Sequence, residues 1–174
     1  RHRARAQALR PFAATDELTF DLSFGWIDSE IEKEPGCIVT AEEDCKAILG
    51  LSNTPEMTIN LAANYVLDTD IGYFIINSGY YYRDDYRLFE DSDLLNQDGY
   101  GMLNLGVTWE SVEGNWYAGV YGKNLTDEEY MVGGYNFVAD NGDGTYTPGL
   151  GGDNTLIGYF GDPMTMHLTI GYRF

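Results

Sequence analysis

Apolar and polar side chains alternate along Met164–Phe174, and this pattern predicts a β-strand with two different faces. Counted back from the C-terminus, every second residue is large and apolar, whereas the residues between are small or polar. The apolar positions are Met164, Met166, Leu168, Ile170, Tyr172 and Phe174. Aromatic residues at the end of such a strand are typical of the interfacial girdle of a membrane β-barrel. A half-buried strand of a soluble sandwich or barrel would also alternate, so both interpretations stay open at this point.

The same period of two recurs in earlier segments. The predicted strands cover residues 18–26, 57–65, 103–110 and 116–121. Residues 71–83 are predicted to form another strand. Large side chains occupy both its odd and its even positions, so the sequence does not tell which face is apolar. Residues 1–10 do not alternate convincingly, and they are predicted to be a poorly defined start or a distorted edge. The strands are about ten residues or longer, which is the length that a tilted membrane-spanning strand requires.

The connections between these strands alternate in length. Short turns at 67–70 and 111–115 alternate with long polar segments at about 28–55, 84–98 and 126–159. A membrane barrel places short turns on one side and long loops on the other, whereas a soluble up-and-down barrel has no reason to separate them. The sequence therefore predicts an all-β protein, a transmembrane antiparallel β-barrel segment of roughly six or seven strands.

Composition agrees with this prediction without deciding it. The 174 residues suit one domain, residues 1–174, and no apolar run reaches the length of a spanning helix. The chain has 14 Tyr and 21 Gly, a profile that carbohydrate-binding sandwiches share. The net charge of −18 argues against nucleic acid binding through phosphates.

Two further features concern export. The arginines at 1, 3, 5 and 10 are not followed by an apolar stretch, so no export signal is visible, and the chain does not begin with Met. A membrane strand without a signal of its own suggests a fragment of a longer protein. Cys37 and Cys45 lie close together in an acidic segment, which favours a small disulfide over a metal site, because no His lies nearby.

Several local motifs resemble one known family. They are Pro11 with Ala14–Leu18, Leu22–Glu30, Asn53–Pro55 ahead of Asn60–Leu61, Gly122–Tyr130, and Gly161–Pro163 ahead of the terminal strand. Together, from about Pro11 onward, they resemble the C-terminal end of a TonB-dependent outer-membrane receptor. The most specific piece is similar to the family's Asn-Leu-Thr-Asp-x-x-Tyr signature, here Asn124, Leu125, Thr126, Asp127 and Tyr130. Met164 departs from the pattern, since many relatives carry Arg at that position.

The signature also has a physical interpretation. Asn124 and Thr126–Asp127 are predicted to hydrogen-bond nearby backbone amides, so that the strand leaves its ladder in a defined direction. Tyr130 is expected to place an amphipathic ring at the height of the membrane interface. The predicted role is structural rather than ligand-binding.

The resemblance implies short periplasmic turns, long extracellular loops and a barrel of about twenty-two strands around a plugged lumen. It implies TonB-energised uptake of a scarce nutrient of siderophore, cobalamin or glycan type, in the bacterial outer membrane. The expected partners are outer-membrane lipid and lipopolysaccharide, the outer-membrane assembly machinery, and the TonB system through a missing N-terminal part. The plug domain is absent from residues 1–174, no cofactor is expected, and Met166, Leu168, Ile170, Tyr172 and Phe174 form the assembly strand.

Candidate chemistry is sparse. Tyr80, Tyr82 and Tyr86 stand at a strand-to-loop transition and are candidates for ligand contact. His167 alternates with the apolar residues and so lies on the same face of the strand as Thr165 and Thr169. It is therefore expected on the wall of the lumen. The Asp140–Gly144 run lacks oxygen ligands at alternate positions, which argues for a loop tip rather than a calcium site. No nucleophile–His–acid set is evident, so an enzyme is not expected.

Two alternatives of other classes remain. A complete small barrel acting as a passive pore or adhesin would need at least about eight strands that close without an edge. A soluble carbohydrate-binding sandwich would fold in water without detergent.

Overall fold

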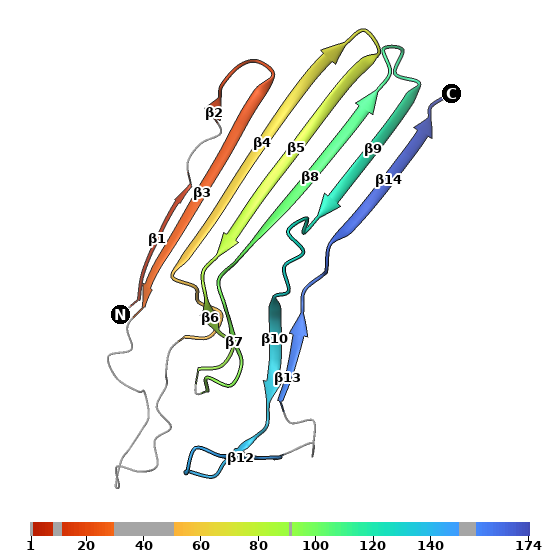
Figure 1. Ribbon diagram of the computed structural model, residues 1–174. Coiled ribbons are helices and arrows are strands. Elements are labelled where there is room, and N and C mark those ends of the chain that lie inside the picture. Colours follow the sequence, from red (N-terminus) through yellow and green to blue (C-terminus); the bar gives the residue numbers. More distant parts are fainter. Residues whose placement is uncertain (1, 9–11, 30–50, 91, 150–155) are drawn as a thin grey trace.

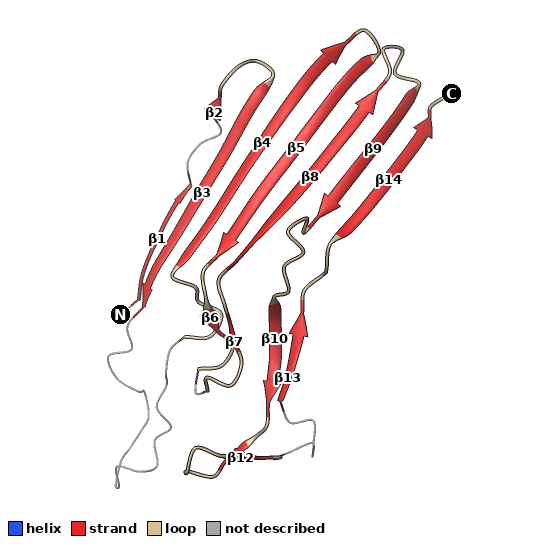
Figure 2. Cartoon of the chain, viewed as in Figure 1, coloured by secondary structure: helices blue, strands red, loops and turns tan. Residues whose placement is uncertain are grey.

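The computed structural model describes residues 2–8, 12–29, 51–90, 92–149 and 156–174. Its main element is an eight-stranded antiparallel sheet in the order β1-β3-β4-β5-β8-β9-β14, with β2 also pairing with β3 (Figure 1). These strands are β1 (His2–Ala8), β2 (Phe12–Ala13), β3 (Leu18–Ser29), β4 (Met57–Thr69), β5 (Gly72–Arg83), β8 (Tyr100–Glu110), β9 (Trp116–Lys123) and β14 (Thr165–Tyr172). The all-β prediction is confirmed, and Figure 2 shows strands and loops alone over the described parts of the chain. Those parts contain no helix that is long and apolar enough to cross a membrane.

The alternation of connection lengths is confirmed as well. Residues 14–17 precede β3, 70–71 join β4 to β5, and 111–115 join β8 to β9, all at the same end of the sheet (Figure 1). The connections after β5 and β9 extend from the opposite end, where β3 also ends and β4 begins.

Local chemistry shapes the short turns. A Cβ on Gly72, which has a φ of 130°, would lie 2.1 Å from the Glu110 carbonyl oxygen, so only glycine fits there. Before β3, the Thr15 hydroxyl accepts hydrogen bonds from the amides of Glu17 and Leu18 at 3.2 and 3.1 Å.

Three segments contain strands that the sequence pattern did not indicate. Residues 2–8 form β1, which pairs with β3, although they contain no large apolar side chain. The segment after β5 contains the hairpin of β6 (Tyr86–Arg87) and β7 (Asn96–Gln97). The segment after β9 contains the pairs β10 (Met131–Asn136) with β13 (Leu156–Phe160), and β11 (Ala139–Asp140) with β12 (Tyr146–Thr147).

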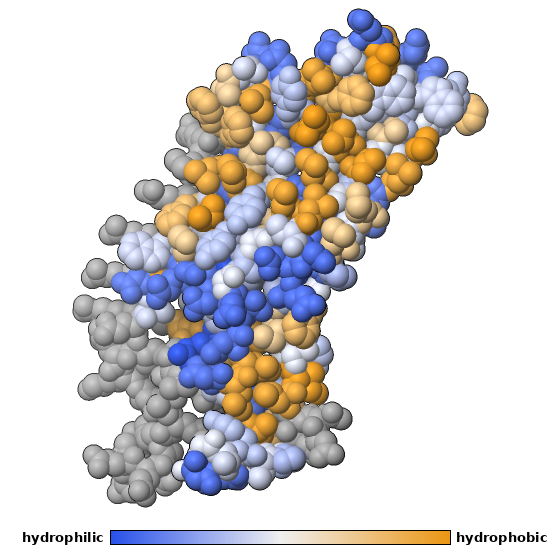
Figure 3. Space-filling view, in the orientation of Figure 1, coloured by the Kyte–Doolittle hydropathy of each residue, from blue (hydrophilic) through white to orange (hydrophobic). Residues whose placement is uncertain are grey.

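The register of the sheet separates an apolar face from a polar face. One continuous row on the apolar face crosses β4, β5, β8, β9 and β14. Its members are Tyr65, Ile76, Val107, Val120 and Leu168. This register settles the facing of β5, where the sequence was ambiguous. Figure 3 shows apolar residues spread over these strands, and no second layer of described residues covers them.

Aromatic rings border the apolar face at both ends. At the short-turn end, Trp116 and Tyr172 pair in register with ring centroids 4.8 Å apart. At the loop end, Trp26 is 54% exposed. From Phe74 to Tyr82, β5 is about 26 Å long at ~3.3 Å per residue. At a tilt of roughly 40°, this length crosses about 20 Å of membrane, which is a little less than the ~25 Å apolar band of outer-membrane barrels.

On the polar face, long side chains lie over glycines. The Tyr121 ring covers Gly119 and Gly106, and its hydroxyl lies 2.9 Å from the Thr108 hydroxyl. Asn77 donates a hydrogen bond of 2.7 Å to Asn64 on the neighbouring strand. Glycines therefore make room for cross-strand aromatic packing, a known device for stabilising sheets.

This packing predicts a difference between two glycines that receive the same substitution. A Cβ on Gly119 would lie 2.8 Å from the Tyr121 ring, whereas a Cβ on Gly79 would meet nothing within 4 Å. Gly119→Val should therefore lower the free energy of unfolding by about 1–3 kcal/mol. Gly79→Val should change it by less than about 0.5 kcal/mol. Denaturant titration in lipid vesicles measures both, and equal losses would show that the Tyr121 contact is unimportant.

Candidate functional site

Asn124, which directly follows β9, lies at the centre of a hydrogen-bond network. Its side chain is 4% exposed and donates to the carbonyls of Glu128 and Asp162 at 2.9 and 3.1 Å. Its Oδ1 accepts from the Glu128 amide at 3.0 Å, and its own amide donates to Asn104 Oδ1 at 2.9 Å. The left-handed φ of 49° suits Asn, which tolerates this region better than most residues.

The rest of the signature connects neighbouring strands. The Thr126 hydroxyl donates to the Gly101 carbonyl of β8 at 2.9 Å, and Asp127 Oδ1 accepts from the Met164 amide at 3.2 Å. The Leu125 amide donates to the Leu103 carbonyl at 2.8 Å. The signature thus ties the end of β9 to β8 and to the entry of β14.

Tyr130 packs against residues of other segments. Its ring is partly buried and stacks on Tyr100 with centroids 4.7 Å apart and an interplanar angle of 17°. The ring also covers Gly161, where a Cβ would lie 2.1 Å from it. Sequence position alone could not reveal this, because Tyr100 and Gly161 are distant in the chain.

Tyr130 belongs to a cluster that we call the loop core. Tyr86, Leu88 and Tyr100 are its buried members, and they are the buried large apolar side chains of the described residues. The partly buried residues around them are Tyr81, Phe89, Leu95, Met102, Tyr130 and Met131. The loop core joins the segment after β5 to the segment after β9.

Two hydrogen bonds fasten Met131 to the β6–β7 hairpin. The Tyr86 hydroxyl donates to the Met131 carbonyl, and the Met131 amide donates to Gln97 Oε1, both at 2.6 Å. Burial raises the pKa of the Tyr86 phenol and outweighs the opposing effect of the Arg83 guanidinium, so the hydroxyl keeps its proton. The two long connections are therefore linked at the base of β10.

Removing the Gln97 acceptor should free the Met131 amide. We expect Gln97→Ala to accelerate hydrogen exchange of this amide by about tenfold or more, since a hydrogen bond worth ~1–2 kcal/mol is lost. Gln97→Glu keeps the acceptor oxygen and serves as the matched control. Equal exchange rates in the two variants would contradict this linkage.

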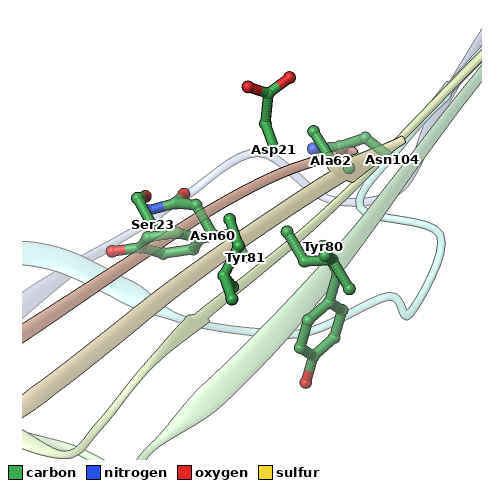
Figure 4. Close-up of a pocket in the computed structure, with 10 residues that line it drawn as sticks. Asp21, Ser23, Asn60, Ala62, Tyr80, Tyr81 and Asn104 are labelled. Atoms are coloured by element: carbon green, nitrogen blue, oxygen red, sulfur yellow. The ribbon is translucent and has the colours of Figure 1, made fainter. Parts of the chain in front are cut away.

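A polar hollow of about 250 Å³ lies on the polar face of β3, β4, β5 and β8 (Figure 4). Its polar lining comes from Asp21, Ser23, Asn60, Tyr81 and Asn104. Ala62 and Gly79 form the floor, because they lie in register between Asp21 and Asn104. In Figure 4, the Tyr80 ring points to the opposite side of the sheet from Asp21.

The structure does not bring the three candidate tyrosines onto one surface. Tyr80 and Tyr82 pair in register with Leu61 and Ile59 on the apolar face. Tyr86 is 4% exposed inside the loop core, where its hydroxyl is already bonded. The hollow was not predicted as a site. The alternation along β3, β4 and β8 could have shown that Asp21, Ser23, Asn60 and Asn104 lie on the polar face. The face of Tyr81 could not be predicted, because β5 has large residues at both odd and even positions.

The remaining candidates occupy separate places. His167 lies on the polar face, in register with Tyr121. Asp143 accepts two hydrogen bonds from Thr145, which lower the pKa of its carboxyl, and the described residues contain no cluster of metal-binding side chains. Cys37 and Cys45 lie outside the described residues, so the predicted disulfide stays a prediction.

Solved structures of iron-uptake receptors have this arrangement of strands. The ferric yersiniabactin uptake receptor FyuA of Yersinia pestis matches with a TM-score of 0.67 and 17% identity, over 94% of this chain and 22% of that chain. BauA, the ferric preacinetobactin receptor of Acinetobacter baumannii, matches with a TM-score of 0.64 and 15% identity, over 98% of this chain and 22% of that chain. The ferric-catecholate import receptor Fiu of E. coli K12 matches with a TM-score of 0.61 and 17% identity, over 92% and 19%.

The chain has the fold of a segment of the β-barrel of these receptors. No family model and no curated protein matches the sequence. The chain spans 22%, 22% and 19% of the three receptors named above. In an outer-membrane barrel, the apolar face contacts lipid and the polar face lines the lumen.

Proposed function

We propose that this chain forms part of the wall of a bacterial outer-membrane receptor that imports a scarce nutrient with energy from the TonB system. A ferric siderophore is the nutrient we favour, since the structurally similar receptors are named for such compounds. Outer-membrane lipid and lipopolysaccharide surround the apolar face, and the assembly machinery inserts the chain. The TonB system engages parts of the receptor outside residues 1–174.

One observation carries the proposal: a single sheet has a continuous apolar face with aromatic rings at both ends and a polar face behind it. On β14, Met166, Leu168 and Ile170 are 65%, 70% and 66% exposed. A soluble sandwich would bury such a face against a second sheet. Exposed apolar area on this scale needs lipid or a partner to cover it.

The loop core supports a receptor rather than a plain pore. The two long connections after β5 and β9 pack together through buried tyrosines, and they lie beyond the ends of these strands (Figure 1). Ordered structure at the mouth of a barrel provides a surface for capturing a ligand.

Uptake assays test the proposal. Deletion of the coding region should abolish uptake of one class of ⁵⁵Fe-siderophore, and deletion of tonB should have the same effect. Membrane fractionation should place the protein in the outer membrane. A soluble protein, or unchanged uptake of ferric siderophores, cobalamin and glycans, would overturn the proposal. Loss of cobalamin or glycan uptake alone would overturn the siderophore choice and support the receptor.

A further inference from the structure

Arg83, the last residue of β5, contacts two long connections at once. Its Nη2 atom donates a hydrogen bond of 3.0 Å to the carbonyl of Asn53, in the segment that leads into β4. Its guanidinium carbon lies 3.8 Å from the centroid of the Tyr86 ring, in the segment after β5, which is within the range of a cation–π interaction. The backbone of Arg83 is fixed in the sheet, where it pairs with Thr58 and Tyr100. Arg83 therefore fastens both segments to the sheet.

The backbone of Asn53 is held by the same segment after β5. Its amide donates to the Arg87 carbonyl at 2.8 Å, and Ser52 forms a parallel β-bridge with Arg87. Asn53 has a left-handed φ of 53°, a conformation that persists when neighbouring contacts determine it. The amide and the carbonyl of Asn53 thus both depend on residues at or after the end of β5.

Tyr86 extends these contacts to the segment after β9. Its ring faces Arg83, and its hydroxyl donates to the Met131 carbonyl. The Met131 amide in turn donates to Gln97 on β7. A continuous series of contacts therefore runs from Asn53 through Arg83 and Tyr86 to Met131, and it includes the described parts of all three long connections.

Separating one of these segments from the others would break the series at a buried point. Tyr86 is 4% exposed, and Arg83 Nε is buried without a hydrogen-bond partner among the described residues. The guanidinium thus already lacks one partner, and loss of the Asn53 carbonyl or of the Tyr86 ring would leave it with fewer still. Because buried polar groups are costly to leave unpaired, opening at one contact favours opening at the next.

We propose that these three segments open and close as one body, which we call the lid, with Arg83 as its joint to the sheet. The lid comprises residues 51–56, 84–90, 92–99 and 130–136. The proposal rests on the proposed function in one respect, because that function places the lid at the outer mouth of a receptor. A ligand that binds any one of the three segments would then restrain the other two, since coupling between sites is reciprocal.

Hydrogen exchange in the complete receptor, purified from the outer membrane, tests the proposal. Arg83→Met removes the guanidinium and should accelerate exchange of the Asn53 and Met131 amides by about tenfold each, although Met131 bonds to Tyr86 and Gln97 rather than to Arg83. Tyr86→Phe removes only the hydroxyl, at the far end of the series, and should accelerate exchange at Asn53 as well as at Met131, by about fivefold.

Arg87→Met is the matched control, because it makes the same substitution in the same connection. The Arg87 side chain forms an ion pair with Asp93, which belongs to that connection too. Exposed ion pairs contribute little, so exchange at Asn53 and Met131 should change by no more than about twofold. Unchanged exchange along β4 in every variant shows that the barrel itself is intact.

Acceleration at Asn53 alone in Arg83→Met, or at Met131 alone in Tyr86→Phe, would overturn the proposal, because the segments would then open independently. An effect of Arg87→Met as large as that of Arg83→Met would overturn it as well. If Arg83→Met does not assemble, Tyr86→Phe decides the question by itself. Membrane fractionation keeps the result separate from the proposed function: a receptor found outside the outer membrane overturns that function, whereas independent opening overturns the lid alone.

Discussion

Asn124→Ala is expected to lower the free energy of unfolding by about 3–5 kcal/mol. The substitution leaves two carbonyls and one amide, from Glu128 and Asp162, without the partner that Asn124 supplies. An unpaired buried polar group costs about 1–3 kcal/mol. Alanine would also have to adopt the left-handed φ of 49°, at a further ~1 kcal/mol. Denaturant titration of the protein in lipid vesicles, followed by Trp fluorescence, measures the loss.

Two variants separate these causes. Asn124→Gly removes the same hydrogen bonds but accepts the positive φ, so it should lose about 1 kcal/mol less than Asn124→Ala. Asn115→Ala, at an exposed turn position, should stay within about 0.5 kcal/mol of the unaltered chain. A loss of under 1 kcal/mol for Asn124→Ala would contradict the central position of this side chain.

A charge on the apolar face is expected to be costly, and the same charge one residue further along the strand to be tolerated. Leu168→Arg places a guanidinium near the middle of the apolar face and should lower stability by about 2–4 kcal/mol. Thr169→Arg places it on the polar face, where water reaches it, and should cost less than about 1 kcal/mol.

These neighbours on β14 form a matched pair, because their charge, side-chain length and depth in the membrane are nearly the same. Titration of folding into lipid vesicles with urea gives both free energies. Similar losses for the two variants would mean that the faces do not differ in environment, which contradicts a lipid-facing sheet.

The strands with one large residue at every second position were predictable from sequence. On β3, β4, β9 and β14, alternation alone identified both the strand and its apolar face, as the register from Leu18 through Tyr65 to Leu168 confirms. The alternation of short and long connections was also predictable, because turn residues and polar stretches mark the connections in the sequence.

Other features depend on contacts between distant residues, which sequence patterns do not contain. The strand β1 pairs with β3 although it has no large apolar residues to mark one face. The side on which Tyr80 and Tyr81 lie was unclear, because β5 is rich in large residues at both parities, and only its pairing with β4 decides it. The contacts of Tyr86 with Met131, and of Tyr130 with Tyr100, connect separate loops.

The assignment of one face to lipid and the other to the lumen is tested most directly by a spin-label scan of β14. Single cysteines would replace residues 165–172, in the background Cys37→Ser and Cys45→Ser, and the chain would be reconstituted in lipid vesicles. Labels at Met166, Leu168, Ile170 and Tyr172 should be accessible to oxygen, and those at Thr165, His167 and Thr169 to a water-soluble nickel chelate, with a period of two. Uniform accessibility to the nickel chelate along the strand would contradict the assignment.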